Sequence, residues 1–220
     1  MRLTIQLYTV RDLLAEDAPG TFRKLKAAGL DFVEGGGSYG AADAKEARKM
    51  LDDIGLSVSG SHVGVDRLEN DLQAVIDEMH ELDCPFVIVP WIGADRYANG
   101  WRAFGESLEP IGEKLAANRL TLCYHNHDFE YANGNGLEEL FSATDPRYVQ
   151  AELDVMWVHK GGHDPVTEAT RFKDRLPLLH LKDYVPGNDP QWVPAGQGVV
   201  DLAQVIEIGK AAGTKFGAVE

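Results

Sequence analysis

Side chains that bind metals or carry protons gather in the stretch LTLCYHNHDFEY, residues 120–131. His125 and His127 are two residues apart, so on an extended chain both side chains face the same way. Imidazole and carboxylate ligands together suit Mn²⁺, Fe²⁺, Co²⁺ or Zn²⁺, and imidazole also titrates near neutral pH. The stretch therefore predicts metal binding, proton transfer or both where a strand ends. We interpret Asp128 and Glu130, which follow, as solvated loop carboxylates.

Similar side chains end three later apolar runs. Glu152 and Asp154 share one face of the strand in AELDVMW, where acids are costly unless they are paired or bind a metal. We expect Asp154, at the tip, to be a metal ligand and the deeper Glu152 to hold a hydrogen bond or an ion pair behind it. The next two runs end in LLHLKD, with His180 and Lys182, and in FGAVE, with Glu220.

Eight short apolar runs alternate with helix-like segments. The runs are 3–8, 31–35, 56–63, 85–90, 120–125, 149–154, 176–183 and 214–220. The helix-like segments include 17–29, 43–55, 65–83, 101–119, 164–175 and 201–212, with a kink or a break expected at Pro110. This alternation predicts βαβ units in one domain, 1–220. Eight strands favour a closed (β/α)₈ TIM barrel over a doubly wound open sheet, and the sequence ends without a helix after the eighth strand.

The carboxyl ends of the strands of a parallel barrel converge on one mouth, where the site is built. We therefore expect one divalent cation there, surrounded by His125, Asp154, His180 and Glu220. Aromatic rings at a barrel mouth stack on sugar faces, or else seal the edge of the core. The residues predicted to contact a substrate are Tyr8, Glu34, His62, Trp91 and Trp157.

Two glycine-rich stretches are weaker indications of a ligand-binding loop. Gly35, Gly37 and Gly40 match G-x-G-x-x-G after a strand, but a lone match is weak. The acid expected at the end of the following strand is absent, because that strand ends in His62. We interpret the glycines as a flexible loop rather than a dinucleotide site. The loop 194–201 either lies over a substrate or merely turns the chain.

Composition excludes several classes of protein. The net charge of −14 and the absence of a Lys/Arg run argue against a nucleic-acid partner. Cys84 and Cys123 match no paired zinc spacing and suit free thiols in the cytoplasm. The N-terminus becomes charged too early for a signal peptide, and no apolar run approaches the roughly 20 residues of a membrane span.

In this order along the chain, the strand-end motifs resemble those of the xylose-isomerase-like TIM barrels, the sugar phosphate isomerase/epimerase superfamily. The motifs are QLYTVRD, SGSHVG, YHNHDFEY, ELDVMWV, LLHLKD, GQGVVD and AVE. Members such as ketose 3-epimerases and inosose dehydratases bind one divalent metal, often Mn²⁺, through Glu, Asp, His and Glu from strands five to eight. The resemblance implies that Asp154, His180 and Glu220 are three of these ligands. His125 stands where the epimerases have the first glutamate.

The resemblance also implies a reaction. One Mn²⁺, or Mg²⁺, Co²⁺, Fe²⁺ or Zn²⁺, polarises a carbonyl of a keto-sugar or cyclitol. Glu220, His125 or His127 then removes the neighbouring proton, and Lys182 stabilises the enediolate or instead forms an ion pair. Returning the proton gives isomerisation or epimerisation, whereas expelling a β-oxygen gives dehydration of an inosose or cleavage of a 3-keto-glycoside. Trp157 replaces a polar substrate contact of the epimerases, which indicates a different substrate.

Two rival functions stay open. A metal-dependent phosphodiesterase or repair endonuclease binds two or three metals and binds DNA through basic loops, which the acidic composition disfavours. A non-catalytic sugar-binding barrel is the other rival, suggested by the missing eighth helix and the altered strand five. The expected partner is a small-molecule sugar, and a homodimer is expected because relatives often form one.

Overall fold

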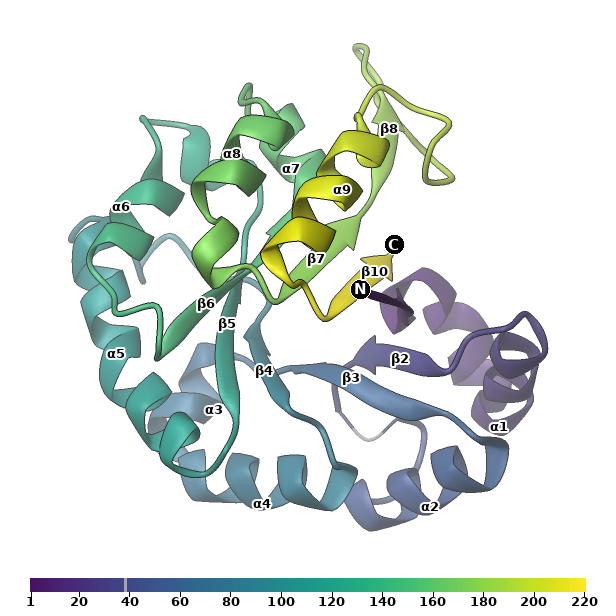
Figure 1. The fold of residues 1–220 in the computed structure, drawn as a ribbon. Helices are drawn as coiled ribbons and strands as arrows, with labels where there is room; N and C mark the ends of the chain where they lie inside the picture. Colours follow the sequence, from purple (N-terminus) through teal and green to yellow (C-terminus); the bar gives the residue numbers. More distant parts are fainter. Residues whose placement is uncertain (38) are drawn as a thin grey trace.

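The computed structural model describes residues 1–37 and 39–220. Eight strands close into a parallel barrel in the order β1-β10-β7-β6-β5-β4-β3-β2, and helices surround it (Figure 1). The predicted TIM barrel is therefore confirmed, and each of the eight predicted runs overlaps one barrel strand. The barrel strands are β1 (Arg2–Gln6), β2 (Phe32–Gly35), β3 (Ser57–His62), β4 (Phe86–Val89), β5 (Thr121–His125), β6 (Val149–Asp154), β7 (Leu178–Leu181) and β10 (Phe216–Val219).

Helices fill most of the connections between strands. The α-helices are α1 (Arg11–Ala27), α2 (Ala44–Ile54), α3 (Val65–Asn70), α4 (Leu72–Leu82), α5 (Trp101–Ala117), α6 (Gly136–Ser142), α7 (Val155–Lys160), α8 (Pro165–Arg171) and α9 (Leu202–Ala212). The short 3₁₀ helices are η1 (Leu7–Val10), η2 (Phe129–Tyr131) and η3 (Lys173–Arg175). Side chains of Asp43, Asp164 and Asp201 cap the amino-terminal ends of α2, α8 and α9. Among the described residues no helix follows β10.

Four predicted helices differ from the observed ones. The segment 164–175 is α8 followed by the 3₁₀ helix η3. The segment 65–83 is two helices, because Asp71 has a non-helical backbone (φ −133°, ψ 35°) between α3 and α4. Helix α1 begins at Arg11, and Asp17, the predicted start, is instead a kink inside it. Helix α5 continues through the exposed Pro110, because buried residues on both sides of the proline, including Phe104 and Leu115, pack in the core.

The segment between β7 and α9 contains a hairpin that the sequence analysis did not predict. Its strands are β8 (Asp183–Val185) and β9 (Gln191–Val193), which pair antiparallel, and the hairpin projects beyond the end of β7 (Figure 1). The buried Asp183 carboxylate accepts hydrogen bonds from the backbone N–H groups of Gly196, Gly198 and Val200. This carboxylate therefore holds the glycine loop 194–201 against the hairpin.

The barrel interior changes character along the strands. An apolar cluster of Phe86, Ile88, Cys123, Leu178 and Phe216 fills the end nearer the amino termini of the strands. Because side chains two residues apart on a strand share a face, the next inward positions after Cys123 and Leu178 are His125 and His180. The fold thus places imidazoles directly above an apolar floor.

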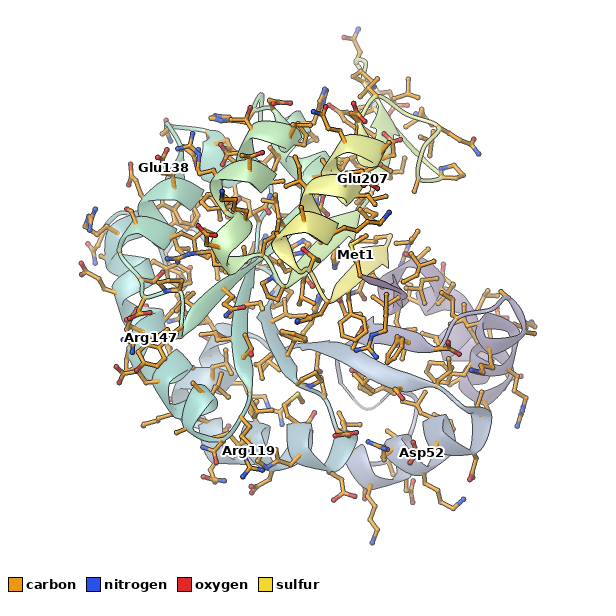
Figure 2. The ribbon with its side chains drawn as sticks, viewed as in Figure 1. Met1, Asp52, Arg119, Glu138, Arg147 and Glu207 are labelled. Carbon is orange, nitrogen blue, oxygen red and sulfur yellow. The ribbon has the colours of Figure 1, made fainter. Side chains whose placement is uncertain are left out.

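Outside the barrel, the surface is charged. Asp52, Arg119, Glu138, Arg147 and Glu207 are exposed on the outer face of the molecule (Figure 2). Cys84 and Cys123 are buried and unpaired. Within the described part of the chain, no helix combines the length and the apolar composition needed to cross a bilayer.

Close packing of α5 gives a first prediction. A Cβ atom added at Gly112 would lie 2.3 Å from the backbone oxygen of Tyr148. Replacing a glycine by alanine in a helix interior normally stabilises the protein by about 1 kcal/mol. Here the clash with Tyr148 should make the same replacement destabilising. We expect Gly112→Ala to destabilise the protein by about 2 kcal/mol in urea unfolding. The control Ala103→Gly, on the exposed face of α5, should lose only about 1 kcal/mol. A more stable Gly112→Ala protein would contradict this packing.

Candidate metal centre at the barrel mouth

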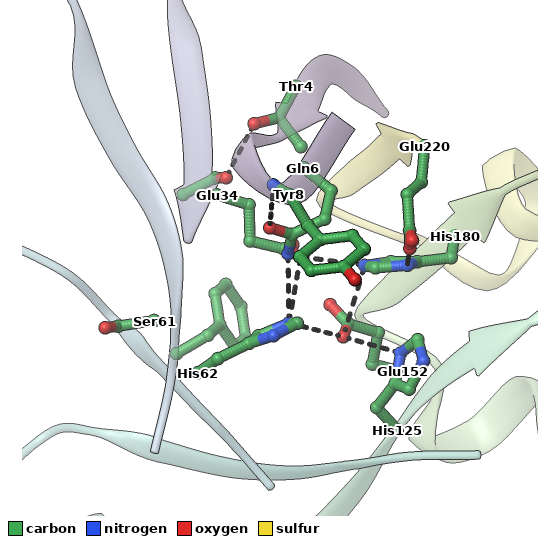
Figure 3. A network of polar contacts seen from close by, with 12 residues as sticks. Thr4, Gln6, Tyr8, Glu34, Ser61, His62, His125, Glu152, His180 and Glu220 are labelled. Carbon is green, nitrogen blue, oxygen red and sulfur yellow. Dashed lines mark hydrogen bonds and ion pairs between the residues drawn. The ribbon is translucent and has the colours of Figure 1, made fainter. Parts of the chain in front are cut away.

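Three predicted metal ligands meet inside the barrel near its carboxyl-terminal end, and Figure 3 shows two of them, His125 and His180. His125 from β5, Asp154 from β6 and His180 from β7 are buried, and one ligand atom of each lies within 4.8 Å of the others. Asp154 Oδ2 lies 3.7 Å from His180 Nδ1 and 3.9 Å from His125 Nε2. The fourth predicted ligand, Glu220, follows β10, and its Oε2 lies 3.1 Å from His180 Nδ1.

The Asp154 carboxylate is held in one orientation. Its Oδ1 accepts the N–H groups of Met156 and Trp157, both at 3.0 Å, at the start of α7. The side chain of Asn126 hydrogen-bonds the backbone N–H and C=O of Asp154. Asp154 Oδ2 is buried and has no hydrogen-bond partner among the described residues. Because an unpaired buried carboxylate oxygen is costly, this atom fits a cation ligand.

Each of the two histidines turns its other nitrogen toward a deeper carboxylate. His125 Nδ1 lies 3.1 Å from Glu152 Oε2, and His180 Nε2 lies 2.7 Å from Glu34 Oε1. Metal-binding histidines commonly donate their other N–H group to a carboxylate, which sets the tautomer and the ring orientation. Glu152 thus lies behind His125, where the sequence analysis expected a supporting contact, and Glu34 lies behind His180.

The deeper carboxylates belong to an inner group with His62. The ligand atoms of Glu34, His62, Glu152 and His180 also lie within 4.8 Å of one another. His62 Nε2 lies 3.3 Å from Glu34 Oε1 and 3.5 Å from Glu152 Oε2. Gln6 Nε2 donates to Glu34 Oε1 at 2.8 Å. The inner group therefore pairs two carboxylates with imidazoles and shares His180 with the outer group.

The local surroundings shift the pKa values of the three mouth histidines in different directions. Burial and the neighbouring His180 hold the pKa of His125 well below its usual range, and burial also lowers the pKa of His127. Both rings are therefore neutral near pH 7. Burial lowers the pKa of His62 as well, but hydrogen bonds with Glu152 and Glu34 outweigh it and raise that pKa to about 9. His62 is therefore protonated near pH 7, beside Glu34 and Glu152.

Glu220 and Lys182 form an ion pair at the edge of the site. Lys182 Nζ donates to Glu220 Oε1 at 2.5 Å, and it lies 5.5 Å from the ring centre of Trp157 and 5.9 Å from that of Trp192. Burial raises the pKa of Glu220, but the contacts with His180 and Lys182 outweigh this effect and lower it. The carboxyl group is therefore ionised, with one oxygen toward His180 and the other toward Lys182.

A cavity of about 340 Å³ opens at this mouth. Its lining contains seven of the predicted site residues: Tyr8, His62, His125, His127, Trp157, Lys182 and Glu220. Three others, Glu34, Asp154 and His180, are fully buried beneath it. Trp91 is 59% exposed and follows Pro90, which is part of the lining. Gln6 was not among the predicted site residues, although it ends β1 only two residues before Tyr8.

Glu130 is not a solvated loop residue, so that interpretation was wrong. Its side chain is 1% exposed, and it accepts hydrogen bonds from Tyr124 Oη at 2.7 Å and from the backbone N–H of His127 at 2.9 Å. The turn η2 folds the carboxylate back under strand β5, which no local sequence pattern indicated. Glu130 therefore supports the backbone of His127. Asp128, by contrast, is partly exposed and pairs with Lys160.

Comparison with known proteins gives one family. Residues 22–215 match the family model described as xylose isomerase-like TIM barrel. The inosose dehydratase of Geobacillus kaustophilus is 24% identical over 166 residues, covering 64% of this chain and 54% of that protein. The inosose dehydratase of Lacticaseibacillus casei is 28% identical over 89 residues, covering 38% of this chain and 28% of that protein. The chain thus spans about half, or less, of the length of these curated relatives.

Solved structures share the fold across the whole chain. A sugar phosphate isomerase/epimerase from Parabacteroides distasonis has a TM-score of 0.85 at 24% identity, covering 100% of this chain and 85% of that one. An L-ribulose 3-epimerase has a TM-score of 0.68 at 16% identity, covering 100% of this chain and 80% of that one. At these identities the likeness shows the fold.

The buried Glu130 gives a prediction about stability and pH. Burial raises its pKa to about 7, so between about pH 4.5 and 7 the folded state holds a proton that the unfolded state releases. The stability of the wild type should therefore fall as pH rises through this window. The glutamine of Glu130→Gln stays neutral at every pH. The difference in free energy of unfolding between this variant and the wild type should therefore shift in favour of the variant by about 2 kcal/mol from pH 5 to pH 8.

Urea unfolding at both pH values measures this change. The control Glu106→Gln, at an exposed position on α5, should keep the pH dependence of the wild type, because it leaves the buried Glu130 carboxyl group in place. A constant difference between Glu130→Gln and the wild type across this range would contradict the raised pKa.

Proposed function

This chain belongs to the xylose isomerase-like TIM barrel family, and we propose that it is an enzyme that isomerises or epimerises a small keto-sugar or cyclitol. In this proposal one divalent cation is held at the barrel mouth, and a side chain of the mouth removes the proton next to a carbonyl. The reaction proceeds through an enediolate. A nuclease would differ from this proposal by binding two or three metal ions per chain. A non-catalytic barrel would differ by exchanging no substrate hydrogen with solvent.

The single observation that carries the proposal is the orphaned Asp154 Oδ2. It is buried without a hydrogen-bond partner in the described part of the chain, and the nearest imidazole nitrogens belong to His125 and His180. We propose that His125 Nε2, Asp154 Oδ2, His180 Nδ1 and Glu220 Oε2 hold the cation. Two nitrogens and two oxygens suit Mn²⁺, and also Co²⁺, Fe²⁺ or Zn²⁺, with Mg²⁺ a poorer match to imidazole.

The bound cation would polarise a carbonyl and an adjacent hydroxyl of the substrate, which makes the intervening C–H group acidic. The protein supplies the rest. Lys182 Nζ, which lines the cavity beside Glu220, is placed to stabilise negative charge on the enediolate. The rings of Trp157 and Tyr8 provide faces on which a sugar packs.

We assign the base to His127. Both nitrogens of His125 face carboxylates, and both oxygens of Glu220 face His180 or Lys182. His127, in contrast, lines the cavity, and its ring pairs with no carboxylate among the described residues. Burial lowers its pKa, so the ring is neutral and accepts a proton at pH 7.

A second outcome is expulsion of a β-oxygen, which makes the enzyme a dehydratase or a lyase acting on an inosose or a 3-keto-glycoside. The curated relatives that the chain matches are inosose dehydratases, and this match favours the second outcome. Both outcomes begin with the same proton abstraction. A cytoplasmic location and a homodimer remain predictions.

Cation binding tests the proposed ligands. We expect the wild type to bind one Mn²⁺ per chain by calorimetry, and Asp154→Asn to weaken this affinity by roughly 100-fold or more, because Asp154 is a direct ligand in this proposal. Asp128→Asn is the matched control, since its carboxylate contacts Lys160 instead, and it should bind as the wild type does. Unchanged affinity in Asp154→Asn would remove the centre of the proposal.

Glu34, the carboxylate behind His180, gives a prediction of a smaller loss of Mn²⁺ affinity. Glu34→Gln should weaken Mn²⁺ affinity by roughly 10- to 100-fold, because it loosens the tautomer and the orientation of His180 without removing a ligand. The control Glu16→Gln, at an exposed position on α1, should change nothing. Equal affinity in wild type and Glu34→Gln would show that Glu34 does not orient the histidine.

Hydrogen exchange tests the chemistry. The Mn²⁺-loaded protein, incubated with keto-sugars and inososes in deuterated water, should exchange the C–H hydrogen beside the carbonyl of its substrate. His127→Asn should slow this exchange by roughly 10²- to 10⁴-fold while leaving Mn²⁺ affinity unchanged. Absence of exchange with every compound would reject the enzymatic reaction for those compounds, and unchanged exchange in His127→Asn would reject His127 as the base.

A further inference from the structure

A second cavity adjoins the mouth cavity on the side of β1. Its volume is about 430 Å³, against about 340 Å³ for the mouth cavity. The two cavities have Gln6, Tyr8 and His62 in common. Tyr8 is 62% exposed, and Figure 3 shows its ring beside the polar network of the mouth. A ligand in the mouth cavity therefore has a second space next to it, with Tyr8 at the boundary.

The second cavity is largely apolar. Leu7, Leu14 and Ala15 line it on the side of η1 and α1. Gly35 and Gly36 line it on the side of β2. A Cβ atom at Gly36 would lie 2.7 Å from the backbone oxygen of His62, and one at Gly35 would lie 2.8 Å from Leu7 Cδ1. These glycines therefore let β2 and its loop approach their neighbours closely enough to form a wall.

Among the described lining residues, each cavity has one lysine or arginine. Arg11 Nη1 donates to the backbone oxygen of Tyr8 at 2.8 Å, and its guanidinium lies 4.2 Å from the centre of the Tyr8 ring. Lys182 pairs with Glu220 in the mouth cavity. Arg11 has no carboxylate partner among the described residues, so it is the largely apolar lining, and not neutralisation of Arg11, that indicates an uncharged ligand. The net charge of −14 further disfavours an anionic ligand.

We propose that this second cavity, lined by Tyr8, Arg11, Leu14, Ala15 and Gly36, binds an uncharged, flat and largely apolar substituent attached to the sugar. The substrate class is then a glycoside with an aromatic group rather than a free sugar or a sugar phosphate. This inference rests on the proposed function, because it places the sugar ring in the mouth cavity. The substituent passes the Tyr8 ring, whose face suits stacking against a flat group.

The test compares two inert probes on the Mn²⁺-loaded full chain. Phenyl and methyl β-D-glucopyranoside lack a carbonyl, so neither is turned over by proton abstraction. Calorimetry should show that phenyl glucoside binds the wild type about tenfold more tightly than methyl glucoside, because only the phenyl group buries apolar area in the second cavity.

A cavity-filling variant locates the effect. Ala15→Phe places a ring in the second cavity and should reduce the phenyl-to-methyl preference to about one, leaving methyl glucoside binding unchanged. The control Leu13→Phe adds a ring to the same helix at an exposed position outside the lining, and should keep the preference. No preference in the wild type, no binding of phenyl glucoside, or an equal loss for both probes in Ala15→Phe overturns the proposal.

Charge is tested separately. Glucose 6-phosphate should bind no more tightly than glucose. If it binds more tightly and Arg11→Gln abolishes the difference, the proposal that the substituent is uncharged is wrong. Deuterium exchange and Mn²⁺ binding test the proposed function separately from the second cavity. Exchange with no phenyl preference would reject the second cavity and keep the enzyme, whereas a phenyl preference without exchange would keep the cavity and reject the reaction.

Discussion

The structure of the site depends on the burial of three carboxylates inside the barrel. Glu34, Glu152 and Asp154 are fully removed from solvent, and an ionised carboxylate in such a place is costly unless other groups compensate it. Imidazoles compensate two of them, since the protonated His62 lies beside both Glu34 and Glu152, and His180 also faces Glu34. Asp154 has its Oδ1 satisfied by backbone N–H groups and its Oδ2 left over. In the proposed function a cation at that atom would complete the compensation, so the network that stabilises the interior would also hold the metal.

The geometry of the strands determines which of these charged side chains face the barrel interior and which lie next to one another. Inward positions along each strand recur every two residues, so apolar side chains fill one end of the barrel and polar ones the other. Pairing then aligns the strands: His125 lies opposite Glu152, and Asp154 lies opposite His180. A shift of one residue in either pairing would turn these side chains to the helix-facing side. The regular packing of the apolar floor thus protects the alignment of the centre above it.

The rim of the mouth is built differently from its interior. Its contributors come from irregular segments, including the turn after β5 and the β8–β9 hairpin. His127 lies between the rings of Phe129 and Trp157, with ring centres 5.6 and 5.1 Å away, and Trp192 of the hairpin extends this aromatic surface to Trp157. Asp183 fixes the hairpin to the glycine loop by three backbone hydrogen bonds. The rim therefore consists of segments outside the barrel strands, and in the proposed function these segments would contact the substrate.

Alternation of apolar runs with capped helical segments sufficed to predict the barrel, because strand and helix periodicity are local properties of the chain. It also sufficed to place His125, Asp154, His180 and Glu220 at converging strand ends. Local pattern did not reveal the burial of Glu130, the β8–β9 hairpin or the second cavity beside Tyr8. Nor did it show that Glu34 lies behind His180, 146 residues away in sequence. Which side chain faces a ligand and which supports it is decided by contacts between distant strands, and those exist only once the barrel has closed.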